Sequence, residues 1–221
     1  MKPLRCRCQN KDGSVCDNPV KEPTLFCALH QKCGLSPMSG WEPEFDPKRY
    51  NGDEAVQSTH NCFSYAMNVI DPNQVKQCKG NPRCRPYFHQ PGATRKMSKL
   101  LYKEENRNCK VVERLMDMDV PIKRTTFRRK CPAKMSKIAI TVHPGEDYHV
   151  LRQDSDGIWS HKDGGNPVKR FDADGQDILD PKTANRDYRP RSFLNYKDFC
   201  GYYCVPRDAD HPINLSRSRP S

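Results

Sequence analysis

Two segments of this 221-residue chain have residue types and a spacing that suit nucleophilic chemistry. The first, His60-Asn61-Cys62-Phe63-Ser64, places a cysteine at the expected first turn of a helix. The unpaired N–H groups and positive dipole end of a helix favour the thiolate, which is the reactive form. The second, Asp147-Tyr148-His149-Val150, is an expected strand that would hold an imidazole beside that sulfur. Cys62 is therefore a candidate nucleophile and His149 its candidate base.

A second histidine follows one hairpin later, in Ile158-Trp159-Ser160-His161. Residues across a hairpin on one face lie about 5 Å apart, so we expect His161 to orient and polarise His149, the third-member role in catalytic triads. Asp154 or a backbone carbonyl is the alternative orienter. Asn61 is a candidate second donor for an oxyanion hole. Taken singly, Cys62 and His149 fit a buried small side chain and a structural strand histidine equally well.

A Cys/His cluster occupies the first 33 residues. Cys8, Cys16, Cys27 and His30 follow the pattern C-x7-C-x10-C-x2-H. Thiolate and imidazole ligands suit tetrahedral zinc, and so small a segment needs a metal to fold because it buries little apolar surface. Whether Cys6 or Cys33 replaces one of the four is open, and disulfides or free thiols are the alternative. A structural zinc is favoured over a docking or nucleic-acid-binding knuckle.

The elements that would position these residues are an α+β body. Phe63, Ala66, Met67 and Ile70 lie at helical spacing from Asn61 onward. A second helix is expected over 97–118, broken near 106–108, followed by strands at 137–142, 148–153, 158–162 and 199–205. The expected domains are a Cys/His zinc-binding module (1–33), a linker (34–58), the α+β domain (59–205) and a polar tail (206–221).

The charge of the chain and its lack of a signal peptide or membrane span narrow its expected partners and location. Lys and Arg outnumber Asp and Glu by 38 to 27, which favours polyanionic partners. Nucleic acid is one such partner for the basic run at 123–134, although a solvated face or a protein contact is favoured there. We see neither a signal peptide nor a membrane span, so we expect a cytoplasmic or virion protein.

Cysteine clusters in a reducing compartment point to metal or catalysis rather than disulfides. Six further cysteines have no decisive pair spacing and leave a second metal site or disulfides open: Cys78, Cys84, Cys109, Cys131, Cys200 and Cys204.

The order Cys62, His149, His161 resembles the papain-like clan in its NlpC-type form, over about residues 59–165. The resemblance implies a Cys-bearing helix packed on an antiparallel sheet and a thiol hydrolase, a cysteine protease or amidase. Cys62 would attack a peptide or amide carbonyl, and His149 would protonate the leaving group and then activate water to release the acyl-enzyme. Here Asn-Cys-Phe-Ser stands where the family usually has Asp-Cys-Ser-Gly, which favours a different substrate or a scaffold role.

The N-terminal module resembles a short Cys/His module of large DNA virus proteins. The matching segments are Lys11-Asp12-Gly13-Ser14-Val15-Cys16 and Phe26-Cys27-Ala28-Leu29-His30. This resemblance implies an alternative of another class, a structural minor capsid or virion-associated protein that uses the hydrolase-like fold as a scaffold. Its partners would be other virion or capsid proteins.

Overall fold

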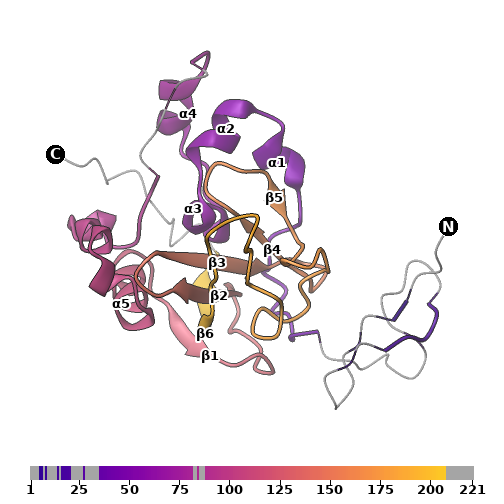
Figure 1. The fold of residues 1–221 in the computed structure, drawn as a ribbon. Helices are drawn as coiled ribbons and strands as arrows, with labels where there is room; N and C mark the ends of the chain where they lie inside the picture. Colours follow the sequence, from indigo (N-terminus) through magenta and orange to yellow (C-terminus); the bar gives the residue numbers. More distant parts are fainter. Residues whose placement is uncertain are drawn as a thin grey trace.

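The computed structural model describes residues 5, 6, 8, 14, 16–20, 27, 35–81, 84 and 88–207. Short helices precede one antiparallel sheet of six strands in the order β1-β6-β2-β3-β4-β5 (Figure 1). The helices are α1 (Pro47–Asn51), α2 (Glu54–Thr59), α3 (Cys62–Ala66), α4 (Pro72–Cys78), the 3-10 helices η2 (Ala93–Arg95), η3 (Ser98–Tyr102) and η4 (Glu104–Asn106), and α5 (Cys109–Asp119). The strands are β1 (Lys123–Thr125), β2 (Met135–His143), β3 (Asp147–Gln153), β4 (Trp159–Lys162), β5 (Val168–Lys169) and β6 (Asp198–Pro206). The expected α+β class is confirmed.

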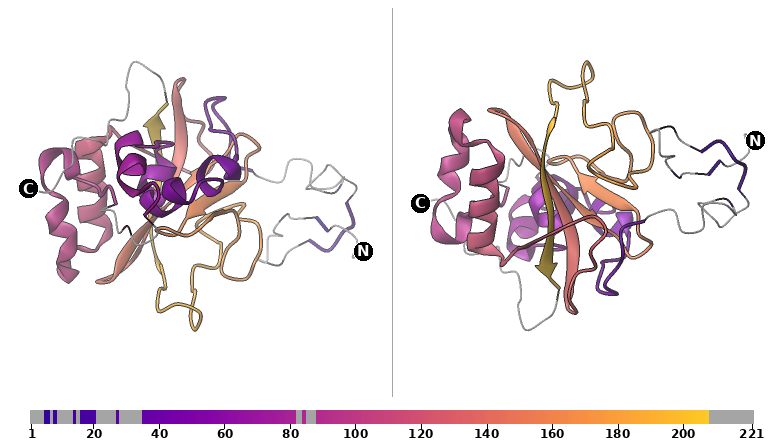
Figure 2. Two further views of the ribbon diagram at one scale, coloured as in Figure 1. Left: turned by 90° about the horizontal axis from the view of Figure 1, so that it is seen from above. Right: turned by 90° about the horizontal axis from the view of Figure 1, so that it is seen from below.

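The helices begin where the sequence supplies caps. Asp53 and Asn61 accept backbone N–H groups at the starts of α2 and α3, because these side chains satisfy donors that the first turn leaves free. Pro47 and Pro72 occupy the first turns of α1 and α4, where their missing N–H costs nothing. Figures 1 and 2 show α1 to α4 gathered on one side of the sheet.

The two faces of the sheet carry separate apolar clusters. On the helix face, Ile140 and Val150 pack with residues of α3 and α5. On the other face, which we call the loop face, Leu151 and Trp159 pack with Ile178 from the segment between β5 and β6. Successive residues of a strand point to opposite faces, so this division fixes which side each residue of β3 occupies.

The four expected strands match β2, β3, β4 and β6 to within two residues, whereas β1 and β5 were not expected and the helices differ. α3 ends at Ala66 and does not continue to Ile70. Segment 34–58, expected as a linker, carries α1 and nearly all of α2 and buries Tyr50 completely. Helix 97–118 is divided into 3-10 turns and α5, as the expected break indicated. Most of 1–33 and the tail from 208 onward lie outside the described residues.

Three disulfides cross-link the body. They join Cys78 to Cys84, Cys109 to Cys200 and Cys131 to Cys204. The sequence left a second metal site or disulfides open for these six cysteines, and the structure shows disulfides. The general expectation of metal or catalysis rather than disulfides is wrong for them. The pairs were hidden in the sequence because two of them join elements that are 91 and 73 residues apart. Within the described part of the chain, no helix is long and apolar enough to cross a membrane.

Candidate active site and candidate metal sites

Cys62 is the first residue of α3 and lies in the protein interior. Its side chain is 5% exposed, and its sulfur lies 4.0 Å from the Tyr148 carbonyl oxygen. Burial raises the pKa of the Cys62 thiol, and the Asp147 carboxylate adds to this rise. A helix of five residues has few aligned peptide dipoles to oppose that effect. The thiol is therefore protonated at neutral pH.

The side-chain amide of Asn61 caps α3 through its oxygen and binds the loop at His89 through its nitrogen. Its Oδ1 accepts from the Ser64 backbone N–H at 3.1 Å, and its Nδ2 donates to the His89 carbonyl oxygen at 2.9 Å. The amide group that was the candidate oxyanion donor is thus already engaged in the structure.

His149 and His161 meet on the loop face. The His149 Nε2 lies 2.8 Å from the His161 Nδ1, and the His149 ring stacks on Tyr196 with a centroid distance of 5.0 Å. Burial is the main cause that lowers the pKa of His149, to about 3, so this imidazole is neutral. Between these described residues, no hydrogen bond joins the Cys62 sulfur to His149.

The pairing of β3 with β4 brings a third polar residue to the histidines. Leu151 pairs with His161, so continuing the register beyond β4 places Asp163 opposite His149. The Asp163 Oδ1 lies 3.3 Å from the His149 Nε2 and 3.0 Å from the His161 Nδ1. Asp163 was missed in the sequence, although counting residues outward from the hairpin turn would have found it.

Asp154, the alternative orienter, serves another purpose. It is fully buried and accepts from the Arg152 Nε at 2.9 Å. Among the described residues, the structure thus brings Asp163 to His149 and His161. Asp154 lies elsewhere, on Arg152, and within the described part of the chain Cys62 makes no hydrogen bond to the histidines.

His60, next to the candidate nucleophile, is a buried structural histidine. Its Nε2 accepts from the Asp71 backbone N–H at 2.8 Å, which leaves the proton on Nδ1 to be donated to the Val56 carbonyl oxygen at 2.9 Å. Burial lowers the pKa of His60, and the nearby His89 and Lys162 lower it further. Protonation of Nε2 would break the bond from Asp71, so the fold holds the neutral ring.

We expect this arrangement to destabilise the protein in acid. The folded-state pKa of His60 is below the unfolded value of about 6.5, so the unfolded state binds more protons and stability is lost as the pH falls below about 6.5. The loss reaches at most about 1.4 kcal/mol per pH unit for this group. Urea unfolding of wild type and His60→Gln between pH 7.5 and 5 should show a shallower pH dependence in the variant. Equal slopes would contradict this assignment.

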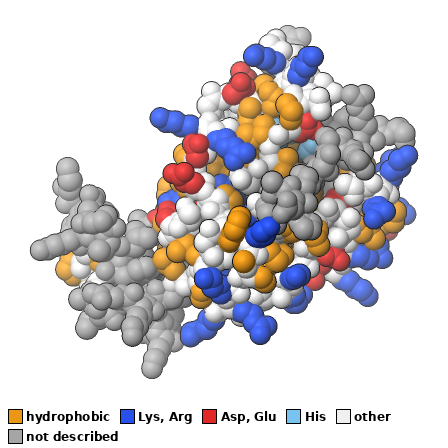
Figure 3. All heavy atoms as spheres, turned by 180° about the vertical axis from the view of Figure 1, so that it is seen from behind, with side chains coloured by type: hydrophobic (Ala, Val, Ile, Leu, Met, Phe, Trp, Pro, Cys, Tyr) orange, Lys and Arg blue, Asp and Glu red, His pale blue; other side chains and the backbone are white. Residues whose placement is uncertain are grey.

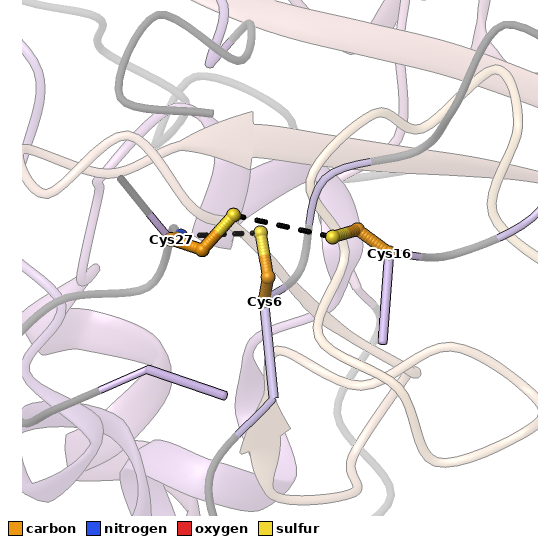
Figure 4. Close-up of side chains that lie close together, drawn as sticks. All are labelled: Cys6, Cys16 and Cys27. Atoms are coloured by element: carbon orange, nitrogen blue, oxygen red, sulfur yellow. Dashed lines mark hydrogen bonds between the residues drawn. The ribbon is translucent and has the colours of Figure 1, made fainter. Parts of the chain in front are cut away.

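A sulfur cluster lies in the N-terminal region. Cys6, Cys16 and Cys27 are buried, and their sulfur atoms lie within 4.8 Å of one another (Figure 4). The Cys16 and Cys27 sulfurs are 4.0 Å apart, and the Cys27 backbone N–H donates to the Cys6 sulfur at 3.2 Å. Zinc–sulfur bonds of about 2.3 Å in a tetrahedron separate the sulfurs by about 3.8 Å. This cluster could therefore hold a metal ion.

The cluster differs in one member from the expected ligand set. Cys8 is in a disulfide bond, and Cys6 stands beside Cys16 and Cys27 instead. Cys6 was one of the two flanking cysteines that the spacing left open. His30 and Cys33 lie outside the described residues.

The basic run at 123–134 gives little support for nucleic-acid binding. Arg124 pairs with Glu113 at 3.1 Å and donates to the Cys200 carbonyl oxygen at 2.8 Å. Phe127, the aromatic residue of the run, packs on Tyr202 with a centroid distance of 5.7 Å, so it does not offer a free stacking surface. On the face shown in Figure 3, Lys and Arg side chains lie at several separate places.

Comparisons with known proteins give one informative result. No family model and no solved structure matches the chain. A relative, the "Insoluble matrix shell protein 1" of Ruditapes philippinarum, is 32% identical over 161 residues, which are 73% of this chain and 88% of the relative.

Proposed function

The chain belongs to the family of insoluble matrix shell protein 1, and from this membership we propose that it is a structural protein of an insoluble matrix. The observation that carries the proposal is the alignment itself, which spans most of both chains. The partners would be other structural proteins of the same matrix. The alternative expected from the sequence was also a structural role, and the alignment supports that role; the virion setting stays a prediction.

The disulfides support a structural role in an oxidising environment. Disulfides persist there and are rare in reducing compartments. Two of them tie β6 to distant parts of the body, one at Cys200 to α5 and one at Cys204 to Cys131. Cross-links of this kind restrict the unfolded chain, and that restriction favours a protein that must keep its shape inside an assembly.

We also propose that Cys6, Cys16 and Cys27 hold a structural zinc ion, with His30 as the fourth ligand expected from the sequence. The sulfur separations fit tetrahedral zinc. The Asn18 Nδ2, 3.6 Å from the Cys27 sulfur, and the Cys27 N–H would stabilise the thiolates as outer hydrogen-bond donors. Zinc would supply the stability that so small a module cannot obtain from apolar burial.

A papain-like thiol hydrolase is the second candidate. One observation favours it: the 2.8 Å hydrogen bond between His149 and His161 is the contact expected between a base and its orienter. Two features are against it. Burial raises the pKa of the Cys62 thiol, although the thiolate is the nucleophile, and α3 packs on the helix face of the sheet whereas His149 lies on the loop face.

Alkylation of Cys62 distinguishes the two candidates. The native full-length protein is treated with limiting iodoacetamide from pH 5 to 9 and analysed peptide by peptide, with the denatured protein as control. For a structural protein we expect Cys62 to stay unmodified in the native state and to react as an ordinary thiol after denaturation. Rapid labelling well below pH 8, slowed by His149→Ala, would replace the structural proposal with the hydrolase.

Fractionation of the source material tests the structural role directly. With an antibody against the chain, we expect the protein in the residue that remains insoluble after detergent extraction, and its release only by denaturant. Recovery in the first soluble extract would contradict the proposal.

A further inference from the structure

We propose that His149, His161 and Asp163 bind a divalent transition-metal ion on the loop face, at a site separate from the Cys6, Cys16 and Cys27 cluster. This inference goes beyond the structural role, since neither the alignment nor the disulfides require it.

The geometry of the three ligand atoms carries the proposal. The His149 Nε2, the His161 Nδ1 and the Asp163 Oδ1 are separated from one another by 2.8, 3.0 and 3.3 Å. Ligands about 2.1 Å from one ion lie about 3.0 Å apart in octahedral and about 3.4 Å apart in tetrahedral geometry. All three atoms therefore fit the first coordination shell of a single ion.

The hydrogen-bond donors and acceptors at the site also favour a cation. The His161 Nε2 lies 2.9 Å from the Phe171 carbonyl oxygen, and since a carbonyl only accepts, this nitrogen carries the proton. Without a second proton, the His161 Nδ1 presents a lone pair to the Asp163 Oδ1 at 3.0 Å. The His149 Nε2, 2.8 Å from that nitrogen and 3.3 Å from Oδ1, has a single proton for these two acceptors. A metal ion at the common point satisfies all three atoms.

Neighbouring groups hold the three ligands in place. The Phe171 carbonyl fixes the His161 ring in the way that outer-shell carbonyls orient metal-bound histidines. The Lys169 Nζ lies 2.5 Å from the Asp163 Oδ2, which leaves Oδ1 as a monodentate ligand. The Tyr196 ring stacks on His149, and its hydroxyl donates to Asp147 at 2.8 Å. The ligand positions are thus fixed before an ion arrives.

The donor set selects the class of metal. Two imidazoles and one carboxylate suit zinc, cobalt, nickel, copper or ferrous ions rather than calcium or magnesium, which prefer oxygen ligands. Both histidines are almost fully buried, whereas the Asp163 side chain is 25% exposed, so an ion would enter past Asp163. Water would complete the coordination.

Metal binding and the hydrolase mechanism compete for the same atoms. The His149 Nε2 and the His161 Nδ1 form the hydrogen bond by which His161 would orient the base. An ion bound to both nitrogens replaces that bond. A structural protein in which Cys62 does not react could therefore still bind a metal ion at this site.

Cobalt titration of the full-length protein tests the proposal, because cobalt reports its ligands. A thiolate site gives a charge-transfer band together with d–d bands, whereas a His/Asp site gives d–d bands alone. We expect wild type to bind one equivalent without a thiolate band, in addition to any cobalt held by the cysteine cluster. Asp163→Asn should raise the dissociation constant of this cobalt ion at least about 10-fold. It should leave the thiolate charge-transfer band unchanged.

Two further variants keep the result decisive. Asp187→Asn is the matched control, since Asp187 is another partly exposed aspartate in an ion pair, with Arg189 at 2.6 Å, and it should bind cobalt as wild type does. His149→Gln should also lose the thiolate-free equivalent. Circular dichroism of each variant without metal verifies the fold, and histidine NMR of the wild type, recorded without and with cobalt, serves as a second measurement.

A wild type that shows only thiolate-bound cobalt, or an Asp163→Asn variant that binds as wild type does, would overturn the proposal. If His161 is instead doubly protonated and shares its Nδ1 proton with Asp163, NMR will show an imidazolium at pH 7 that cobalt does not perturb. That result would also overturn it.

Discussion

Removal of the Cys109–Cys200 disulfide lowers the free energy of unfolding by about 4 kcal/mol. The bond ties the first residue of α5 to β6. Because the Cys131–Cys204 disulfide stays intact in the variant, the loop that the bond closes runs from Cys109 to Cys131 and from Cys204 back to Cys200, and a loop of about 28 residues restricts the unfolded chain by about this amount. The paired Cys109→Ser and Cys200→Ser variant should therefore unfold at a much lower urea concentration than wild type. Equilibrium urea unfolding, followed by tryptophan fluorescence, measures the difference.

The Cys78–Cys84 disulfide provides the matched control. Its partners are only 6 residues apart, so the same loop-closure argument predicts a loss of about 2 kcal/mol when both are replaced by serine. The ratio of the two losses is the informative quantity, since both variants delete one disulfide. Equal losses would show that loop closure does not account for the stabilisation.

Substitution of Arg152 by methionine lowers the free energy of unfolding by about 3 to 5 kcal/mol. Arg152 is 1% exposed and pairs with the fully buried Asp154 at 2.9 Å. Loss of the guanidinium leaves a buried carboxylate without its charged partner, which is the costly way to break such a pair. Arg170 lies 3.7 Å from the other Asp154 oxygen, too far to replace the lost hydrogen bond.

Arg152 also joins parts of the chain that the sheet alone would not hold. Its guanidinium donates to the Tyr65 carbonyl of α3 at 3.2 Å and to the Glu44 carbonyl at 3.1 Å, and it lies 4.0 Å from the centre of the Tyr65 ring. We therefore expect hydrogen exchange in α3 to accelerate in the variant more than exchange in β6.

Two variants separate the loss of the ion pair from a general effect of the substitution. Arg189→Met removes an exposed partner of Asp187 and should cost less than about 1 kcal/mol. The double variant Arg152→Met with Asp154→Leu removes both charges and should recover part of the loss. If it is less stable than Arg152→Met alone, desolvation of Asp154 is not the cause.

The structural proposal and the metal site together change the meaning of the two histidines. The sequence predicted His149 as a base and His161 as its orienter, yet the structure adds Asp163 within 3.3 Å of both. A set of three ligand atoms has uses that do not require a nucleophile. The family relationship to a shell matrix protein is compatible with that outcome.

Local patterns in the sequence determined the class of the fold and most of the strands. The strands at β2, β3, β4 and β6 were placed to within two residues, because alternating apolar side chains and a hairpin turn act over neighbouring residues. The same range of interaction explains why His149 and His161 were recognised as neighbours: one short hairpin separates them.

Only the tertiary structure decided which distant residues meet and which are excluded from water. The partner of Cys109 depends on the position of β6 against α5, and only the structure shows that Cys6 rather than Cys8 lies beside Cys16 and Cys27. The burial of Cys62 likewise depends on contacts with elements far along the chain, and this burial raises the pKa of its thiol. The spacing of residues along a sequence does not report burial or contacts between distant elements. For that reason the same Cys and His pattern fits both an enzyme and a structural protein.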